Sequence, residues 1–185
     1  MLPARFTKWL RLAGAASLVL FASLNIVAQE DPTVVSDANH AGSFSELLDK
    51  RRALLVVFKS RVISVENRDR AVIEDVLKAD PHPTGRYRWV YSQIANKLNK
   101  YINKYQSLSA AGGIADADYV IYFNVVEFRR ILNAYYPYGE LFVIVKGSPQ
   151  ELKPPRIVWR AKKVMVSTDA IRDFIKDLKA LRGEG

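Results

Sequence analysis

Cysteine is absent from this 185-residue chain. Its absence excludes disulfide bonds, thiolate metal sites, cysteine nucleophiles and a lipid-modified cysteine near the N-terminus. A hydrophobic core alone must therefore hold the fold together, and a single domain of this length buries enough surface to do so. Hydrophobic residues make up 49% of the chain and charged residues 25%, which is the composition of an ordinary globular domain.

Residues and motifs typical of catalysis are also scarce. The two histidines, His40 and His82, have no second ligand at metal-binding spacing, and we interpret both as loop residues. The chain contains no Gly-x-Ser-x-Gly elbow, no glycine-rich phosphate loop and no dinucleotide fingerprint. We therefore expect no catalytic activity and no cofactor. A hydrolase with an unfamiliar site is kept as the third and weakest alternative.

Acidic residues are missing from the start of the chain. Residues 1–11 carry three basic side chains, an apolar run follows up to Ala28, and a polar stretch comes next. This order is typical of a secretory signal peptide, so we predict cleavage after Ala28 and an exported protein, periplasmic or secreted. The alternative is a retained membrane anchor, but the apolar run is interrupted by Asn25 and is shorter than the roughly 20 residues that span a bilayer.

The remaining chain is predicted to form one domain. Residues 29–42 are polar and contain proline and glycine, which indicates a flexible lead-in. The domain itself is expected to span residues 43–183. No repeat of domain size and no low-complexity segment is present.

Hydrophobic spacing predicts an α/β fold of the two-layer α+β type. We expect helices over 44–50, 68–78, 86–105 and 169–181, and strands over 53–60, 119–128, 140–146 and 156–166. The helical segment after the first strand favours parallel pairing of that strand with a later one, and the short connections between the last three strands favour an antiparallel meander. The prediction is one mixed four-stranded sheet, in the order β-α-α-β-β-β-α, with helices mainly on one face.

Two charged groups lie at the ends of the predicted central strand. Asp116 and Asp118 precede it and have the ligand type of a divalent-cation site, although aspartates at a strand start more often accept hydrogen bonds from turn amides. Glu127, Arg129 and Arg130 follow the strand. They form either an anion site or, as we favour, a solvated strand end.

Tyrosines gather in the predicted loop between the second and third of the four strands. Tyr135, Tyr136 and Tyr138 surround Pro137, which makes a stiff and amphipathic segment. Such rings suit a protein interface or a membrane interface. The alternative, which we weigh equally, is that they fold back onto the end of the sheet.

Basic charge is the other surface feature. The net charge is +9, and it falls to +6 without the leader and its three basic residues. Lys97, Lys100 and Lys104 line the polar side of the predicted helix 86–105, where they are candidates for binding anionic lipid or polysaccharide. A solvated helix face is the favoured interpretation. Nucleic acid is not expected as a partner, because the aromatic signatures of RNA-binding sheets are missing.

Three segments carry a family resemblance. Residues 117–123 (ADYVIYF), 139–145 (GELFVIV) and 157–161 (IVWRA) are similar to strand patterns in a group of small exported bacterial envelope proteins, many of them lipoproteins of uncharacterised function. The resemblance covers about residues 85–165. It implies an envelope location and a non-enzymatic role, and it supplies no catalytic residues. Lipid anchoring is not carried over, because this chain lacks the cysteine that anchoring requires.

These observations favour an exported, non-catalytic envelope protein that binds or assembles with another envelope protein. The sheet edge and the tyrosine segment are its candidate contact surfaces. The second hypothesis is a peripheral binder of anionic lipid or polysaccharide through a basic face. The sequence leaves the oligomeric state open.

Overall fold

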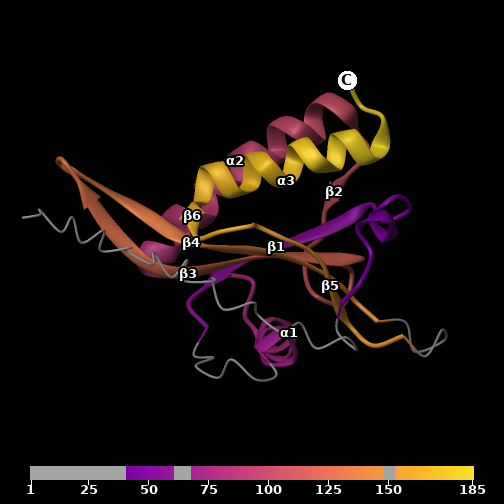
Figure 1. Ribbon diagram of the computed structural model, residues 1–185, viewed down its shortest axis with the longest axis horizontal. Helices are drawn as coiled ribbons and strands as arrows, with labels where there is room; N and C mark the ends of the chain where they lie inside the picture. Colours follow the sequence, from indigo (N-terminus) through magenta and orange to yellow (C-terminus); the bar gives the residue numbers. More distant parts are fainter. Residues whose placement is uncertain (1–40, 61–67, 148–152) are drawn as a thin grey trace, which may run out of the picture. The chain divides into compact units, whose positions relative to one another are not determined.

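The computed structural model describes residues 41–60, 68–147 and 153–185. They form an α+β fold in which a mixed sheet of six strands packs against three α-helices (Figure 1). The predicted leader and the lead-in up to His40 lie outside the described residues, so the structure does not test them.

The sheet is built around β1 (Arg52–Phe58), β3 (Tyr119–Ile131) and β4 (Ala134–Val145). The strand order is β2-β1-β3-β4-β5, and β6 pairs with β4 beyond the end of β5. The three short strands are β2 (Ser109–Ala110), β5 (Arg156–Arg160) and β6 (Met165–Val166).

The strand directions are as predicted, whereas the number of strands and the order of elements are not. β1 runs parallel to β3, with Val57 opposite Phe123, and α1 and α2 form the connection between them. β3, β4 and β5 follow one another as antiparallel neighbours. The prediction of only four strands is wrong, and so is the order of elements, because the sheet also contains β2 and β6. Each of these two strands has only two residues. A strand that short leaves no alternation for a sequence pattern to reveal.

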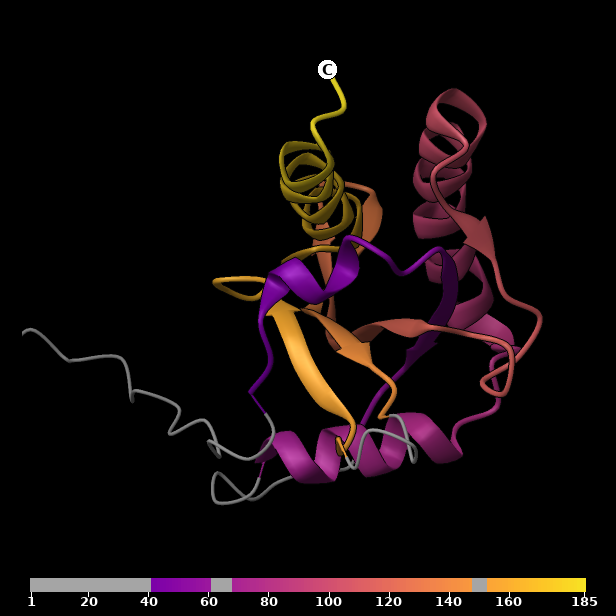
Figure 2. The ribbon, with the colours of Figure 1, turned by 90° about the vertical axis from the view of Figure 1, so that its right-hand side faces the viewer.

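The helices cover both faces of the sheet (Figures 1 and 2). The longer helices, α2 (Gly85–Tyr105) and α3 (Ser167–Arg182), pack side by side on one face, while α1 (Arg68–Lys78) lies on the other. The expectation of helices mainly on one face therefore holds only for α2 and α3. The first predicted helix is a single 3₁₀ turn, η2 (Phe44–Leu47).

Alternating side chains of the strands fill two cores. Leu55 and Phe123 point toward α2 and α3, whereas Val56 and Tyr122 point toward α1, where they meet Val76. All five side chains are buried. Each fully buried side chain of this size contributes about 1.5–3 kcal/mol before conformational entropy is counted, so the central strands need no disulfide to stay in place.

The predicted tyrosine loop is wrong, because residues 135–138 belong to β4. β3 and β4 are joined by a two-residue turn at Leu132 and Asn133, and Ile131 pairs with Ala134 on either side of it. Pro137 is tolerated inside the strand because β4 has only β3 as a neighbour at that point, so its missing N–H interrupts no ladder on the outer side.

The end of this hairpin extends beyond the rest of the sheet. β1 pairs with β3 only as far as Asn124, and β6 reaches only Tyr138 and Gly139 of β4. Residues 126–138 therefore form a projection, two-stranded beyond Tyr138, which we call the arm (Figure 1, left).

The predicted strand 156–166 is split into β5 and β6, with residues 161–164 looping out between them. Among the helices of the described residues, none combines the length and the apolar character needed to cross a bilayer.

Candidate functional site

A bulge at Val126 begins the arm and sets which side chains share a face. Val125 lies opposite Gly139 and Glu127 lies opposite Tyr138, so Val126 is the extra residue of the longer strand. Such bulges bend a strand and increase its twist. The bulge therefore marks the place where the hairpin leaves the sheet.

Both faces of the arm carry an arginine that is paired across the strands with a tyrosine. Arg130 is paired across the strands with Tyr135, and Arg129 is paired with Tyr136. Because neighbouring positions along a strand point to opposite faces, the two pairs lie on opposite sides of the arm. The arm thus presents the same combination, a cation and an amphipathic ring, to both sides.

Exposed apolar side chains concentrate on the arm. Of the eight large hydrophobic side chains that are exposed in the described residues, five belong to it: Val126, Ile131, Leu132, Tyr135 and Tyr136. Leu132, at the tip, is 90% exposed, and Tyr135 is 59% exposed. Scattered exposed hydrophobic residues are normal on a monomer, but their concentration on one projection makes the arm a candidate interaction surface.

The root of the arm is anchored on α2. The ring of Phe128 lies 6.3 Å from that of Tyr87 between centroids, and the Arg86 guanidinium lies 5.2 Å above the Phe128 ring. A groove of about 730 Å³ runs along this junction, between the first turn of α2 and the arm. Its lining is aromatic and cationic: Lys59, Arg86, Tyr87, Trp89, Val125, Val126, Glu127, Phe128 and Tyr135. These contacts hold the root of the arm in place on α2.

The only acidic residue of the arm is neutralised within it. The Glu127 carboxylate accepts a hydrogen bond from Nε of Arg129 at 2.6 Å, and the Arg129 guanidinium lies 4.4 Å from the centre of the Tyr138 ring. Nε of Arg130 donates to the carbonyl of Leu132 at 3.3 Å, which holds this cation beside the turn. The arm consequently carries a net positive charge close to its apolar tip.

The lysines singled out in the sequence lie elsewhere. Lys100 and Lys104 are exposed on α2 and Lys97 is half-buried, all toward the end of the helix remote from the arm. At about 1.5 Å per residue, Lys100 is roughly 21 Å along the axis from Arg86. Lys104 lies over the Tyr105 ring at 4.8 Å. The structure therefore does not bring the lysines and the tyrosines together.

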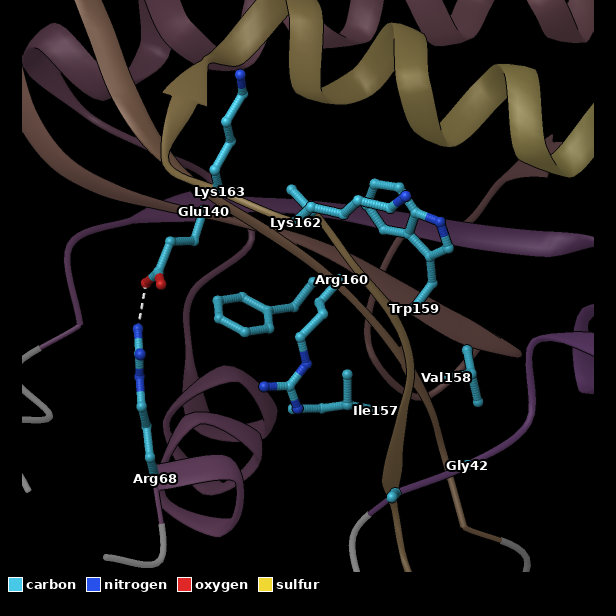
Figure 3. Close-up of a pocket in the computed structure, with 12 residues that line it drawn as sticks. Gly42, Arg68, Glu140, Ile157, Val158, Trp159, Arg160, Lys162 and Lys163 are labelled. Carbon is cyan, nitrogen blue, oxygen red and sulfur yellow. Dashed lines mark hydrogen bonds and ion pairs between the residues drawn. The ribbon is translucent and has the colours of Figure 1, made fainter. Parts of the chain in front are cut away.

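A second hollow, of about 530 Å³, lies at the β5 edge of the sheet (Figure 3). Arg68 reaches from α1 to the Glu140 carboxylate, which also accepts a hydrogen bond from Nδ2 of Asn124 at 3.3 Å. Arg160 forms an ion pair with the buried Asp69 at 2.6 Å. These contacts tie α1 to the sheet, so the carboxylates and guanidinium groups of the hollow already serve a structural purpose.

The same edge carries features that protect it from pairing with another chain. The pairing of β4 with β5 shifts register between Val143 and Ile144, and such an irregularity twists an edge strand. The N–H of Gly42 donates to the carbonyl of Ile157 at 2.8 Å and covers part of the edge. Lys162 and Lys163 are exposed where β5 ends. Because bulges and edge lysines are the usual means of blocking strand addition, we favour the arm over the sheet edge as the interaction surface.

Asp118 has a structural role at the start of β3. Its carboxylate accepts the N–H groups of Arg51 and Arg52, both at 2.9 Å, and forms an ion pair with the Arg52 side chain. Burial alone would raise the pKa of Asp118, but these donors outweigh burial and lower the pKa below its usual value. Asp116, the other member of the candidate cation site, is exposed. Within the described residues no three acidic or histidine side chains converge as a metal site requires.

The sequence predicts only part of the arm. Its pattern indicates Tyr135, Tyr136 and Tyr138 as surface residues, but it favours a solvated strand end for Arg129 and Arg130 and gives no prediction for Ile131 or Leu132. Two features of the sequence could have indicated the hairpin. The apolar segments on either side of Leu132-Asn133 are similar in length, and asparagine is favoured in tight turns. In comparisons with known proteins, the chain matches no protein-family model, no curated protein and no solved structure.

Proposed function

We propose that this chain is an exported, non-catalytic docking module that attaches to another component of the cell envelope through the arm. The observation that carries the proposal is the concentration of exposed apolar side chains on the arm, five of the eight in the described residues. A soluble domain gains nothing in stability from exposing them there. Their burial against a partner would supply the driving force for attachment.

The polar side chains of the fold support a non-catalytic role. Glu140, Asp69 and Asp118 each form an ion pair with an arginine. These ion pairs account for the three carboxylates by structural contacts within the fold, without a catalytic role. Export is supported by the leader-like pattern of residues 1–28.

Site-specific photo-crosslinking in cells tests the proposal. A benzophenone amino acid in place of Tyr136 is expected to form a reproducible adduct, and the Leu132→Ser substitution in the same chain should remove it. The matched control carries the benzophenone in place of Asn103, which is exposed on α2. Equal adducts from both positions, or an adduct that survives Leu132→Ser, would contradict docking through the arm.

A further inference from the structure

We infer that the surface bound by the arm is an anionic lipid bilayer, which the arm enters tip first. This inference rests on the proposed docking function and names its partner. The order of side chains along the arm supports a bilayer as the partner. Leu132 is at the tip, Ile131 and Ala134 follow, and the Arg130–Tyr135 and Arg129–Tyr136 pairs come next. A bilayer presents the matching order of hydrocarbon, interface and charged headgroups.

The dimensions agree with shallow insertion. Each residue of a strand advances about 3.3 Å, so the two arginine–tyrosine pairs lie about 7–10 Å behind the tip. Amphipathic segments enter a bilayer by about 5–10 Å. At that depth the Leu132 and Ile131 side chains reach the acyl chains, and the guanidinium groups of Arg129 and Arg130 lie among the lipid phosphates.

The conformation and exposure of Leu132 also support insertion into a bilayer. Its φ is +54°, a left-handed conformation that is unfavourable for an L-residue, and its side chain is 90% exposed. Glycine or asparagine would form the same turn at lower cost. Neither the turn nor packing within the protein explains a leucine here. The favourable transfer of its side chain from water into hydrocarbon explains it.

The two-sided character of the arm favours a bilayer over a protein. A protein partner normally covers one face of a strand pair, and the other face then has no need of the same residues. Here both faces carry an arginine and a tyrosine. A thin projection that enters a lipid layer is surrounded by it, so both faces require cations for phosphate and rings for the interface.

Charge complementarity specifies anionic lipid. The arm has two arginines and one glutamate, and that glutamate is bound by Arg129. Arg86 is exposed on the first turn of α2, and its guanidinium lies over the Phe128 ring at the root of the arm. Basic residues are attracted to the surface of an anionic membrane, and salt screens this attraction. We therefore expect reversible binding that weakens as the salt concentration rises.

Because the chain has no cysteine, a single introduced cysteine is the only thiol available for labelling, which allows a direct test. A single Asn133→Cys substitution allows the tip to be labelled with an environment-sensitive fluorophore, and Asn103→Cys on α2 provides the control. With vesicles of phosphatidylcholine and phosphatidylglycerol, the tip label should shift to the blue and become protected from iodide. The control label should not change, and vesicles of phosphatidylcholine alone should give at least a tenfold weaker response.

Two substitutions separate binding from stability. Leu132→Gly relieves the left-handed strain, so it should leave the melting temperature equal or higher while vesicle affinity falls at least fivefold. Leu48→Gly, at another exposed leucine far from the arm in sequence, should leave affinity unchanged. A tip label that stays accessible to iodide on anionic vesicles would overturn the lipid inference. The docking function would survive that result if the crosslink at position 136 led to a protein and still depended on Leu132, and it would fail if no such crosslink formed.

Discussion

At the scale of single residues, Gly139 shows how closely the hairpin is packed. A Cβ at this position would lie 2.1 Å from the backbone oxygen of Asn124 and 2.7 Å from the ring of Phe123. Because a backbone atom cannot move aside as a flexible side chain can, we expect Gly139→Ala to lower the free energy of unfolding by about 2–3 kcal/mol. Urea denaturation measures this change.

Gly112 is the matched control for this prediction. An added Cβ there meets no atom within 4 Å, and the residue is exposed. Gly112→Ala should change the free energy of unfolding by less than about 0.5 kcal/mol. Equal effects at the two positions would show that the close approach at Gly139 does not limit stability.

The contact between Glu46 and Arg156 makes stability depend on pH. Nε of Arg156 donates to the Glu46 carboxylate at 2.9 Å, and the Ser43 N–H donates to it at 3.0 Å. Hydrogen bonding from Arg156 is the main reason why the pKa of Glu46 lies below its ordinary value of 4.5. A lowered folded-state pKa means that this stabilisation is complete above pH 4.5 and is lost as the pH falls through the folded-state value.

Glu46→Gln should therefore lower the free energy of unfolding by about 1–2 kcal/mol near neutral pH. The difference from the natural chain should shrink as the pH falls from about 5 toward about 3. Glu74→Gln removes a carboxylate from an exposed ion pair with Arg70 and should cost less than about 0.5 kcal/mol. Denaturation curves across this pH range measure both, and a constant difference for Glu46→Gln would be evidence against the linkage.

At the scale of elements, the end of α2 depends on an unusual residue. Gln106 closes the helix in the left-handed conformation, with φ of +54°, and its N–H donates to the carbonyl of Ile102 at 2.8 Å. Glycine adopts this conformation without strain, whereas a β-branched side chain adopts it poorly. Gln106→Gly should raise the free energy of unfolding by about 0.5–1 kcal/mol and Gln106→Val should lower it by at least about 1 kcal/mol. Thermal melting distinguishes the two, and a loss of stability in both variants would contradict the strain argument.

The sequence predicts a helix or strand well where the spacing of neighbouring residues determines it, and poorly where a distant strand does. α1 has the predicted bounds and α2 differs by one residue, because their apolar positions recur at helical spacing over several turns. β2 has two residues and exists only because β1 lies beside it. No local pattern encodes such a strand, since its pairing partner is distant in sequence.

The sequence does not predict the arm, for a related reason. Pro137 normally indicates a loop, and the sequence does not show that this part of β4 has a free outer edge. The tyrosines were recognised as a surface feature from their chemistry alone. Their partners, Arg129 and Arg130, could be identified only from the register of β3 against β4, which depends on the turn at Leu132 and Asn133.

At the scale of the whole molecule, two exposed edges of the fold have opposite chemistry. The arm carries apolar side chains at its tip, whereas the β5 edge ends in Lys162 and Lys163. Charged side chains on an edge strand oppose association with the edge of another molecule. This difference supports the proposed docking through the arm, and the lysines would oppose association through the partly open β5 edge.

Lys162 and Lys163 allow a test of whether charge protects the β5 edge from association. Replacing Lys162 and Lys163 together with threonine removes two charges beside the edge and adds residues that favour strands, so concentration-dependent self-association should increase. Lys97→Thr with Lys100→Thr removes the same charge from α2, away from the edge, and should not have this effect. Light scattering and sedimentation over a range of concentrations measure the difference. If both double variants associate equally, net charge rather than edge protection keeps the molecules apart, and the sheet edge returns as a candidate contact surface beside the arm.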